Sequence, residues 1–107
     1  MSMAVAERLS VDPGRLADLC AAWRIAEMWV FGSALRDDLR DDSDVDLLVT
    51  FAPGTHPQIG DWLDMEERFA ELFGRKVDLV ERRAVEESPN YSRRRHILSN
   101  LERVYGP

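Results

Sequence analysis

The chain has 107 residues, of which 45% are hydrophobic and 32% charged, with a formal net charge of −6 at pH 7. This is the composition of one globular domain, residues 1–107, and its acidity argues against direct nucleic acid binding, which needs a basic surface. No apolar run approaches the roughly 18 residues of a membrane helix, and the N-terminus has no secretory pattern, so no membrane association and a cytoplasmic location are expected.

The first predicted elements are a helix and a buried strand. Asp12 and Pro13 form a helix start, with the aspartate as N-cap and the proline at the first helical position. Apolar residues then recur at helical spacing, and Cys20 lies among them, so we interpret it as a core thiol and not as a nucleophile. A short apolar run at 28–31, ended by Gly32, predicts the strand.

The segment that follows contains most of the candidate functional residues. We expect a short helix over 33–40, a polar loop, and a second strand over 44–51 that opens with Asp44 and Asp46. Alternate side chains on a strand share a face, so these carboxylates lie side by side, as ligands of Mg²⁺ do. The turn at Gly32 and Ser33 leads into a helix N-terminus, where backbone N–H groups favour a phosphate. Together these features indicate nucleotide chemistry.

A third aspartate follows on a later strand. Helical periodicity predicts a helix from about Asp61 that ends at Gly74, and alternation predicts a strand over 76–80. On that strand Asp78 faces away from its apolar neighbours. Three carboxylates cannot be buried in an apolar core without great cost, so this strand face should be open to solvent, metal and substrate.

The last part of the chain is expected to be an irregular polar segment over 81–90 and one helix over 91–105. Its inward stripe would comprise Arg94, Ile97, Leu98, Leu101, Val104 and Tyr105. The alternation of helices and strands predicts an α/β (α+β) fold, with a small mixed sheet of three to four strands and helices packed on one face.

Several phrases of the sequence resemble a known family. They are Phe31-Gly32-Ser33-Ala34-Leu35-Arg36, Ser43-Asp44-Val45-Asp46-Leu47-Leu48-Val49, Gly74-Arg75-Lys76-Val77-Asp78-Leu79-Val80 and Val104-Tyr105-Gly106. Gly-Ser, a ten-residue spacer and Asp-x-Asp are similar to the signature of the DNA polymerase β-like nucleotidyltransferase superfamily. The closer resemblance, over nearly the whole chain, is to minimal nucleotidyltransferase (MNT) domains, the antitoxins of HEPN/MNT toxin–antitoxin pairs.

The resemblance implies a role for each matching residue. Asp44, Asp46 and Asp78 would bind two Mg²⁺ ions and act in catalysis, and Gly32, Ser33 and Arg36 would hold the phosphates of ATP. Many members have an arginine directly after Gly-Ser, where this chain has Ala34.

The function implied is that of a Mg²⁺-dependent protein adenylyltransferase. It would transfer AMP from ATP to a hydroxyl, a tyrosine, of a HEPN-domain toxin and form a hetero-oligomer with that toxin. Two alternatives remain open: a non-catalytic antitoxin that acts by binding its partner, and a nucleotidyltransferase that acts on a small molecule. The observation that discriminates between these functions is whether the adjacent gene encodes a small helical protein with an R-x4–6-H motif.

Residues outside the signature have simpler interpretations. The run Arg93-Arg94-Arg95-His96 would either touch a phosphate or an acidic partner, or form a solvated helix face. His56 and His96 have no metal-ligand spacing.

Overall fold

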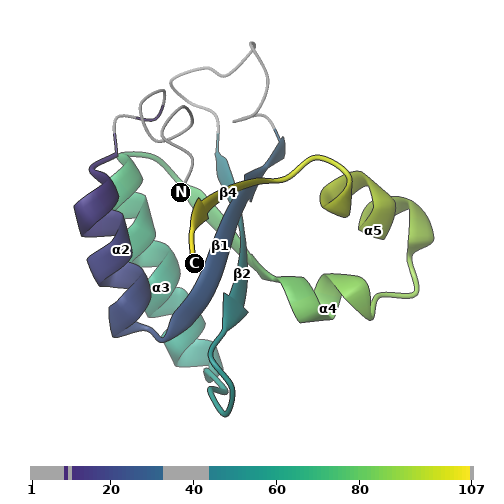
Figure 1. Cartoon of the computed structure of the whole chain (residues 1–107), viewed down its shortest axis with the longest axis horizontal. Helices are drawn as coiled ribbons and strands as arrows, with labels where there is room; N and C mark the ends of the chain where they lie inside the picture. The colour runs from purple at the N-terminus through teal and green to yellow at the C-terminus, as the bar shows by residue number, and fades with distance from the viewer. Residues whose placement is uncertain (1–8, 10, 33–43, 107) are drawn as a thin grey trace.

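The computed structural model describes residues 9, 11–32 and 44–106. Four strands form one mixed sheet in the order β3-β2-β1-β4: β1 (Ile25–Phe31), β2 (Val45–Phe51), β3 (Val77–Glu81) and β4 (Glu102–Tyr105). β1 is antiparallel to β2 and β4, and β2 is parallel to β3 (Figure 1). The mixed sheet predicted from the sequence is confirmed, with four strands.

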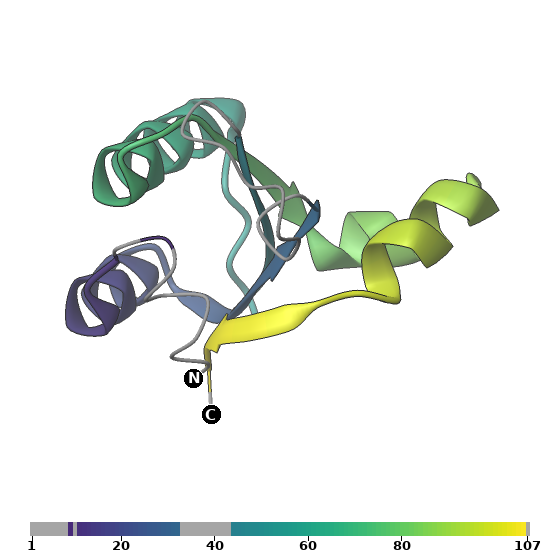
Figure 2. The same cartoon turned by 90° about the horizontal axis from the view of Figure 1, so that it is seen from above.

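The helices lie on both sides of this sheet. α2 (Pro13–Ala22) and α3 (Ile59–Phe73) cover one face, and α4 (Arg82–Glu86) and α5 (Tyr91–Leu98) lie on the other side (Figures 1 and 2). The expectation of helices on one face therefore holds only for α2 and α3. Within the described ranges, no helix has the length and apolar character needed to cross a membrane.

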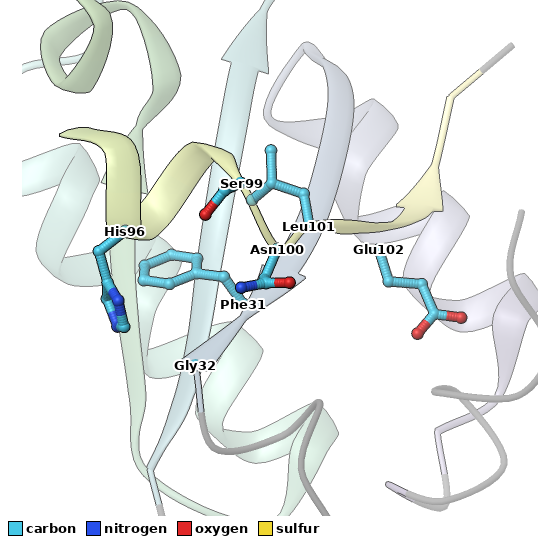
Figure 3. Close-up of a pocket in the computed structure, with 7 residues that line it drawn as sticks. All are labelled: Phe31, Gly32, His96, Ser99, Asn100, Leu101 and Glu102. Carbon is cyan, nitrogen blue, oxygen red and sulfur yellow. The ribbon is translucent and has the colours of Figure 1, made fainter. Parts of the chain in front are cut away.

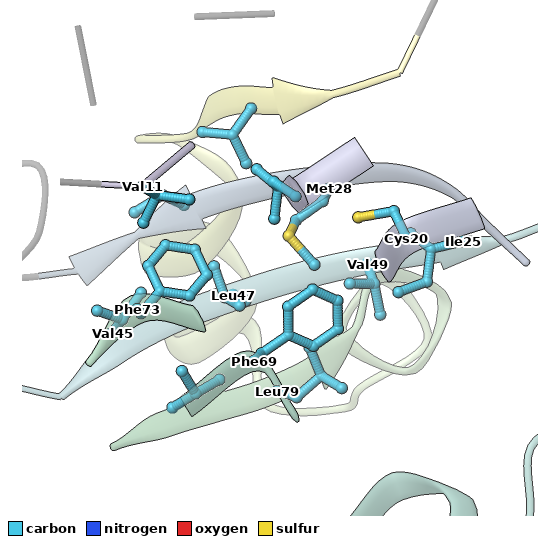
Figure 4. Close-up of a cluster of buried hydrophobic side chains, with 14 of the residues drawn as sticks. Val11, Cys20, Ile25, Met28, Val45, Leu47, Val49, Phe69, Phe73 and Leu79 are labelled. Carbon is cyan, nitrogen blue, oxygen red and sulfur yellow. The ribbon is translucent and has the colours of Figure 1, made fainter. Parts of the chain in front are cut away.

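The main core fills the space between the sheet and the helices α2 and α3 (Figure 4). Met28, Leu47 and Val49 of the sheet and Phe69 of α3 are fully buried in it. Cys20 is also fully buried, and burial raises the pKa of its thiol to about 12. The prediction of a core thiol is thus confirmed.

Local sequence signals set the ends of the two core helices. Asp12 caps α2 by accepting a hydrogen bond of 2.9 Å from the Gly14 backbone N–H. At the start of α3 the Gln58 N–H donates to Asp61 over 2.8 Å, so Asp61 lies in the first turn of a helix that begins at Ile59. α3 ends at Gly74, which has the left-handed φ of 70°. These three predictions were correct to within a few residues.

The C-terminal third differs from the prediction. Residues 82–86, expected to be irregular, form α4, and the Arg82 guanidinium lies 4.5 Å from the centre of the Trp29 ring. The expected helix over 91–105 ends at Leu98, and residues 102–105 form β4. Local periodicity favoured a continuing helix, but these residues instead pair with the open edge of β1, and Val104 of β4 is buried in the main core.

The other sheet face has a smaller core. Trp29 and Phe31 of β1, Leu48 of β2, Val85 of α4 and Ile97 of α5 are buried together. This cluster attaches α4 and α5 to the sheet beside the position of Asp46 and Asp78.

Candidate functional site

Strand pairing places two of the three predicted carboxylates next to each other. In the parallel register of β2 and β3, Asp46 is directly opposite Asp78, and paired strands lie about 4.8 Å apart. Val45, Leu47 and Leu79 point into the main core. Alternation therefore turns Asp46 and Asp78 to the opposite face, as the sequence predicts.

The electrostatics of Asp46 link it to both other aspartates. Asp46 is half-buried, whereas Asp44 and Asp78 are exposed. Desolvation raises the pKa of the Asp46 carboxyl above its ordinary value of 3.8, and the negative charges of Asp78 and then Asp44 raise it further. Ionised Asp46 thus lies where a positive charge would be favoured.

The described residues suit a cation that a second molecule helps to hold. In the part of the chain that the structure describes, no three His, Cys, Asp or Glu side chains are close enough to hold an ion by themselves. Mg²⁺ usually takes one or two protein carboxylates and completes its shell with substrate phosphates and water. The Asp46–Asp78 pair provides hard oxygen donors of this kind, with Asp44 nearby.

Gly32 lies directly against the Asp46 carboxylate. Phe31, the last residue of β1, pairs with Asp46 of β2, and Gly32 follows with a left-handed φ of 77°. A Cβ at Gly32 would collide with Asp46 Oδ2 and would lie 3.3 Å from its Cγ. Glycine is therefore required here for its backbone conformation and for the space it leaves. Ser33 and Arg36, the other predicted phosphate-binding residues, lie outside the described residues, as does the helix expected over 33–40.

A cleft opens above this group of residues. It has a volume of about 390 Å³, and its lining comprises Phe31, Gly32, Asp46, Asp78, Arg93, His96 and Ile97. Two predicted carboxylates and the predicted glycine thus share one cavity with residues of α5. Arg93 and His96 of the basic run border this cleft while remaining exposed to solvent.

The sequence does not by itself show that Arg93 and His96, among the residues of the basic run, border the cleft. Arg93 and Ile97 are four residues apart and lie on one helix face, and Ile97 is buried in the small core. That spacing from an apolar anchor is the only local signal. It becomes informative only when the sheet face under Ile97 is known.

A second cavity of about 470 Å³ adjoins the cleft (Figure 3). Its lining comprises Phe31, Gly32, His96, Ser99, Asn100, Leu101 and Glu102. Phe31, Gly32 and His96 border both cavities. The carboxylate cleft therefore continues into a cavity along the segment between α5 and β4. Polar side chains of that segment line this cavity together with Leu101 and the ring of Phe31.

His56 lines a different cavity, together with Trp23 at the end of α2 and Asp61 in the first turn of α3. Its position gives no reason to assign it to the carboxylate site, in agreement with the sequence interpretation.

Comparison with known proteins places this geometry in a family. A profile described as the nucleotidyltransferase domain matches residues 16–103. The protein adenylyltransferase MntA of Thermococcus cleftensis is 35% identical over 81 residues, which cover 75% of this chain and 80% of that protein. A Methanocaldococcus jannaschii protein assigned as a protein adenylyltransferase is 27% identical over 63 residues, or 59% of this chain and 63% of that protein.

Solved structures share the fold. A protein assigned as a minimal nucleotidyltransferase is 31% identical and superimposes with a TM-score of 0.63, covering 84% of this chain and 86% of that one. A toxin–antitoxin crystal structure with AMP-PNP has a TM-score of 0.69 at 16% identity, covering 91% and 75%; at that identity it shows the fold alone. The profile match over most of the chain and the Thermococcus relative show that this chain belongs to the nucleotidyltransferase domain family.

Proposed function

We propose that this chain, as a single domain over residues 1–107, is a Mg²⁺-dependent protein adenylyltransferase and an antitoxin. It transfers AMP from ATP to a tyrosine hydroxyl of a HEPN-domain toxin and so neutralises that toxin. The Thermococcus relative is named a protein adenylyltransferase. Structures with the same fold include an MntA–HepT toxin–antitoxin complex and a tri-AMPylated Shewanella oneidensis HEPN toxin with its MNT antitoxin.

The observation that carries the proposal is the meeting of Gly32, Asp46 and Asp78 at one cleft. These residues come from three separate strands or strand ends. A solvated strand surface would not need a glycine with positive φ against a half-buried carboxylate. A site for metal-bound phosphates needs both the close backbone approach and the paired oxygens.

Asp44, Asp46 and Asp78 are the residues that would hold Mg²⁺. When bound, Mg²⁺ would supply the positive charge that offsets the charges of the triphosphate and of the reacting oxygens. Gly32 and Ser33 would hold the β- and γ-phosphates, and Arg36 would be a further ATP-binding residue. A second Mg²⁺ ion is part of the proposal because two metal ions can stabilise both the attacking and the leaving oxygen of an in-line displacement.

The reaction requires orientation and charge compensation more than covalent help from the protein. The acceptor oxygen attacks the α-phosphorus, a new P–O bond forms, and the bond to the β-phosphate oxygen breaks. Pyrophosphate leaves, and the hydroxyl proton passes to solvent. Asp78 is exposed to solvent, so an acceptor hydroxyl of another protein can reach it.

A protein acceptor agrees with the shape of the site. The cleft of about 390 Å³ and the cavity beside it can take one nucleotide. A partner that brings its own surface completes such a site.

The test is transfer of label to the partner. The purified protein would be incubated with Mg²⁺, its HEPN partner and ATP labelled either in the α- or in the γ-phosphate. The proposal expects label on the partner from α-labelled ATP only. Labelling from γ-labelled ATP would indicate a kinase, and no labelling from either would contradict adenylyl transfer.

The alternative function is neutralisation by binding alone. Its basis is Ala34, which stands where many family members have an arginine. In that case the HEPN partner would be inhibited in the complex without ATP and would carry no AMP.

A further inference from the structure

Arg93 is a cation at the carboxylate cleft that has no partner among the described residues. Its side chain lines the cleft with Asp46 and Asp78. Within the described ranges it forms no side-chain hydrogen bond or ion pair, although arginine and two carboxylates share one cavity. A guanidinium and two carboxylates that line one cleft suit a ligand with phosphates, which can contact the guanidinium and a cation on the carboxylates together.

The helix that carries Arg93 is firmly attached. The Asn90 side chain caps α5 by accepting a hydrogen bond of 3.1 Å from the Arg93 N–H. One turn later, Ile97 is buried against the sheet with Phe31 and Trp29. The backbone of Arg93 is thus held at both ends of the turn, and its side chain projects from the helix face that Ile97 turns toward the sheet.

The neighbouring arginines have other positions. Arg94 donates a hydrogen bond of 2.9 Å to the Ser88 carbonyl and lies 5.4 Å from the centre of the Tyr91 ring. Arg95 is exposed, as Arg93 is, but it does not line the cleft or the cavity beside it. Among the three consecutive arginines, Arg93 is the one whose side chain borders the cleft.

Resting on the proposed function, we propose that Arg93 binds the phosphate tail of ATP from the side opposite to the aspartates. The guanidinium presents several donors in a plane and forms strong charge-assisted hydrogen bonds to phosphate. The metal held by Asp46 and Asp78 and the guanidinium of Arg93 would then contact the same tail. Arg93 of α5 would thus supply the positive charge that many family members have as an arginine directly after Gly-Ser, where this chain has Ala34.

The test measures binding of three probes, each by calorimetry with Mg²⁺: ATP, inorganic triphosphate and adenosine. The variants are Arg93→Gln and, as matched control, Arg95→Gln on the same helix. We expect Arg93→Gln to weaken both ATP and triphosphate binding about tenfold or more, as for loss of one charge-assisted hydrogen bond. Adenosine binding should be unchanged, Arg95→Gln should match the parent, and Arg93→Lys should recover part of the loss.

Several results would overturn the inference. Equal triphosphate binding by the parent and Arg93→Gln would remove Arg93 from the phosphate site, as would an equal loss of adenosine binding. If AMP transfer is normal while the KM for ATP is unchanged in Arg93→Gln, only this inference fails. If the parent protein binds neither ATP nor triphosphate, the proposed function fails with it. Thermal unfolding of each variant shows whether it is folded.

Discussion

Adding one methyl group at Gly32 tests how closely the turn and Asp46 depend on each other. In Gly32→Ala the new Cβ would have to occupy the place of Asp46 Oδ2, and it would lie 3.3 Å from Cγ. Ordinary contacts between carbon atoms are about 3.5–4.0 Å, so Cγ must move by roughly 0.2–0.7 Å, and Oδ2, which the new Cβ overlaps, must move farther. Gly54→Ala is the matched control, because Gly54 has a φ of 82° and nothing within 4 Å of a Cβ in the described structure.

The two variants separate backbone strain from loss of the site. Both place an L-residue in the left-handed region, which costs roughly 1–2 kcal/mol. Only Gly32→Ala also displaces a carboxylate, and a misplacement of about 1 Å in a reacting site can cost a hundredfold in rate.

The assay pairs the free energy of unfolding, from urea titration, with the rate of AMP transfer at saturating partner. We expect Gly54→Ala to lose stability but keep its rate, and Gly32→Ala to lose at least as much stability and about a hundredfold in rate. If Gly32→Ala transfers AMP at the parent rate, the reasoning that joins Gly32 to Asp46 is refuted.

Three further predictions follow from the burial of single side chains. Since the pKa of Asp46 is raised in the folded protein, its carboxyl favours folding below pH 3.8, and this contribution is lost as the pH rises through the folded pKa. Asp46→Asn should therefore be more stable than the parent at pH 7 and as stable as the parent below pH 3.8; a variant that is less stable than the parent at pH 7 would contradict this. Cys20, with a thiol pKa of about 12, should resist alkylation at pH 8 in native protein and react in urea, and a fast native reaction would disprove its burial. Ile97→Ala should lower the free energy of unfolding by about 2–3 kcal/mol and weaken ATP binding, because Ile97 holds α5 against the sheet. Ile97→Val should lower the free energy of unfolding by only about 1 kcal/mol. If Ile97→Ala is destabilised but binds ATP as the parent does, α5 does not contribute to the site.

Sequence patterns were sufficient for the elements that have their own end signals. Asp12 with Pro13 and the glycine at position 74 mark helix ends by local hydrogen bonding and backbone conformation, and both act as predicted. Alternation on β2 and β3 also predicted which face Asp46 and Asp78 share, because the buried side chains on each strand fix the other face.

The C-terminal third could not be predicted in the same way. Residues 91–105 have an apolar spacing that is compatible with one helix, and only the free edge of β1 makes β4 the better arrangement. The cleft position of Arg93 likewise depends on where Ile97 packs. Both features are decided by contacts between distant segments, which local periodicity does not contain.

The most direct test of the central claim compares transfer and binding in one variant. Asp44→Asn with Asp46→Asn keeps the side-chain shapes but removes two negative charges from the proposed metal site. The account predicts that AMP transfer to the HEPN partner falls by two or more orders of magnitude, while the complex still forms and the toxin stays active in cells. Protection of cells equal to that by the parent protein, with no AMP on the toxin, would contradict the account and establish neutralisation by binding.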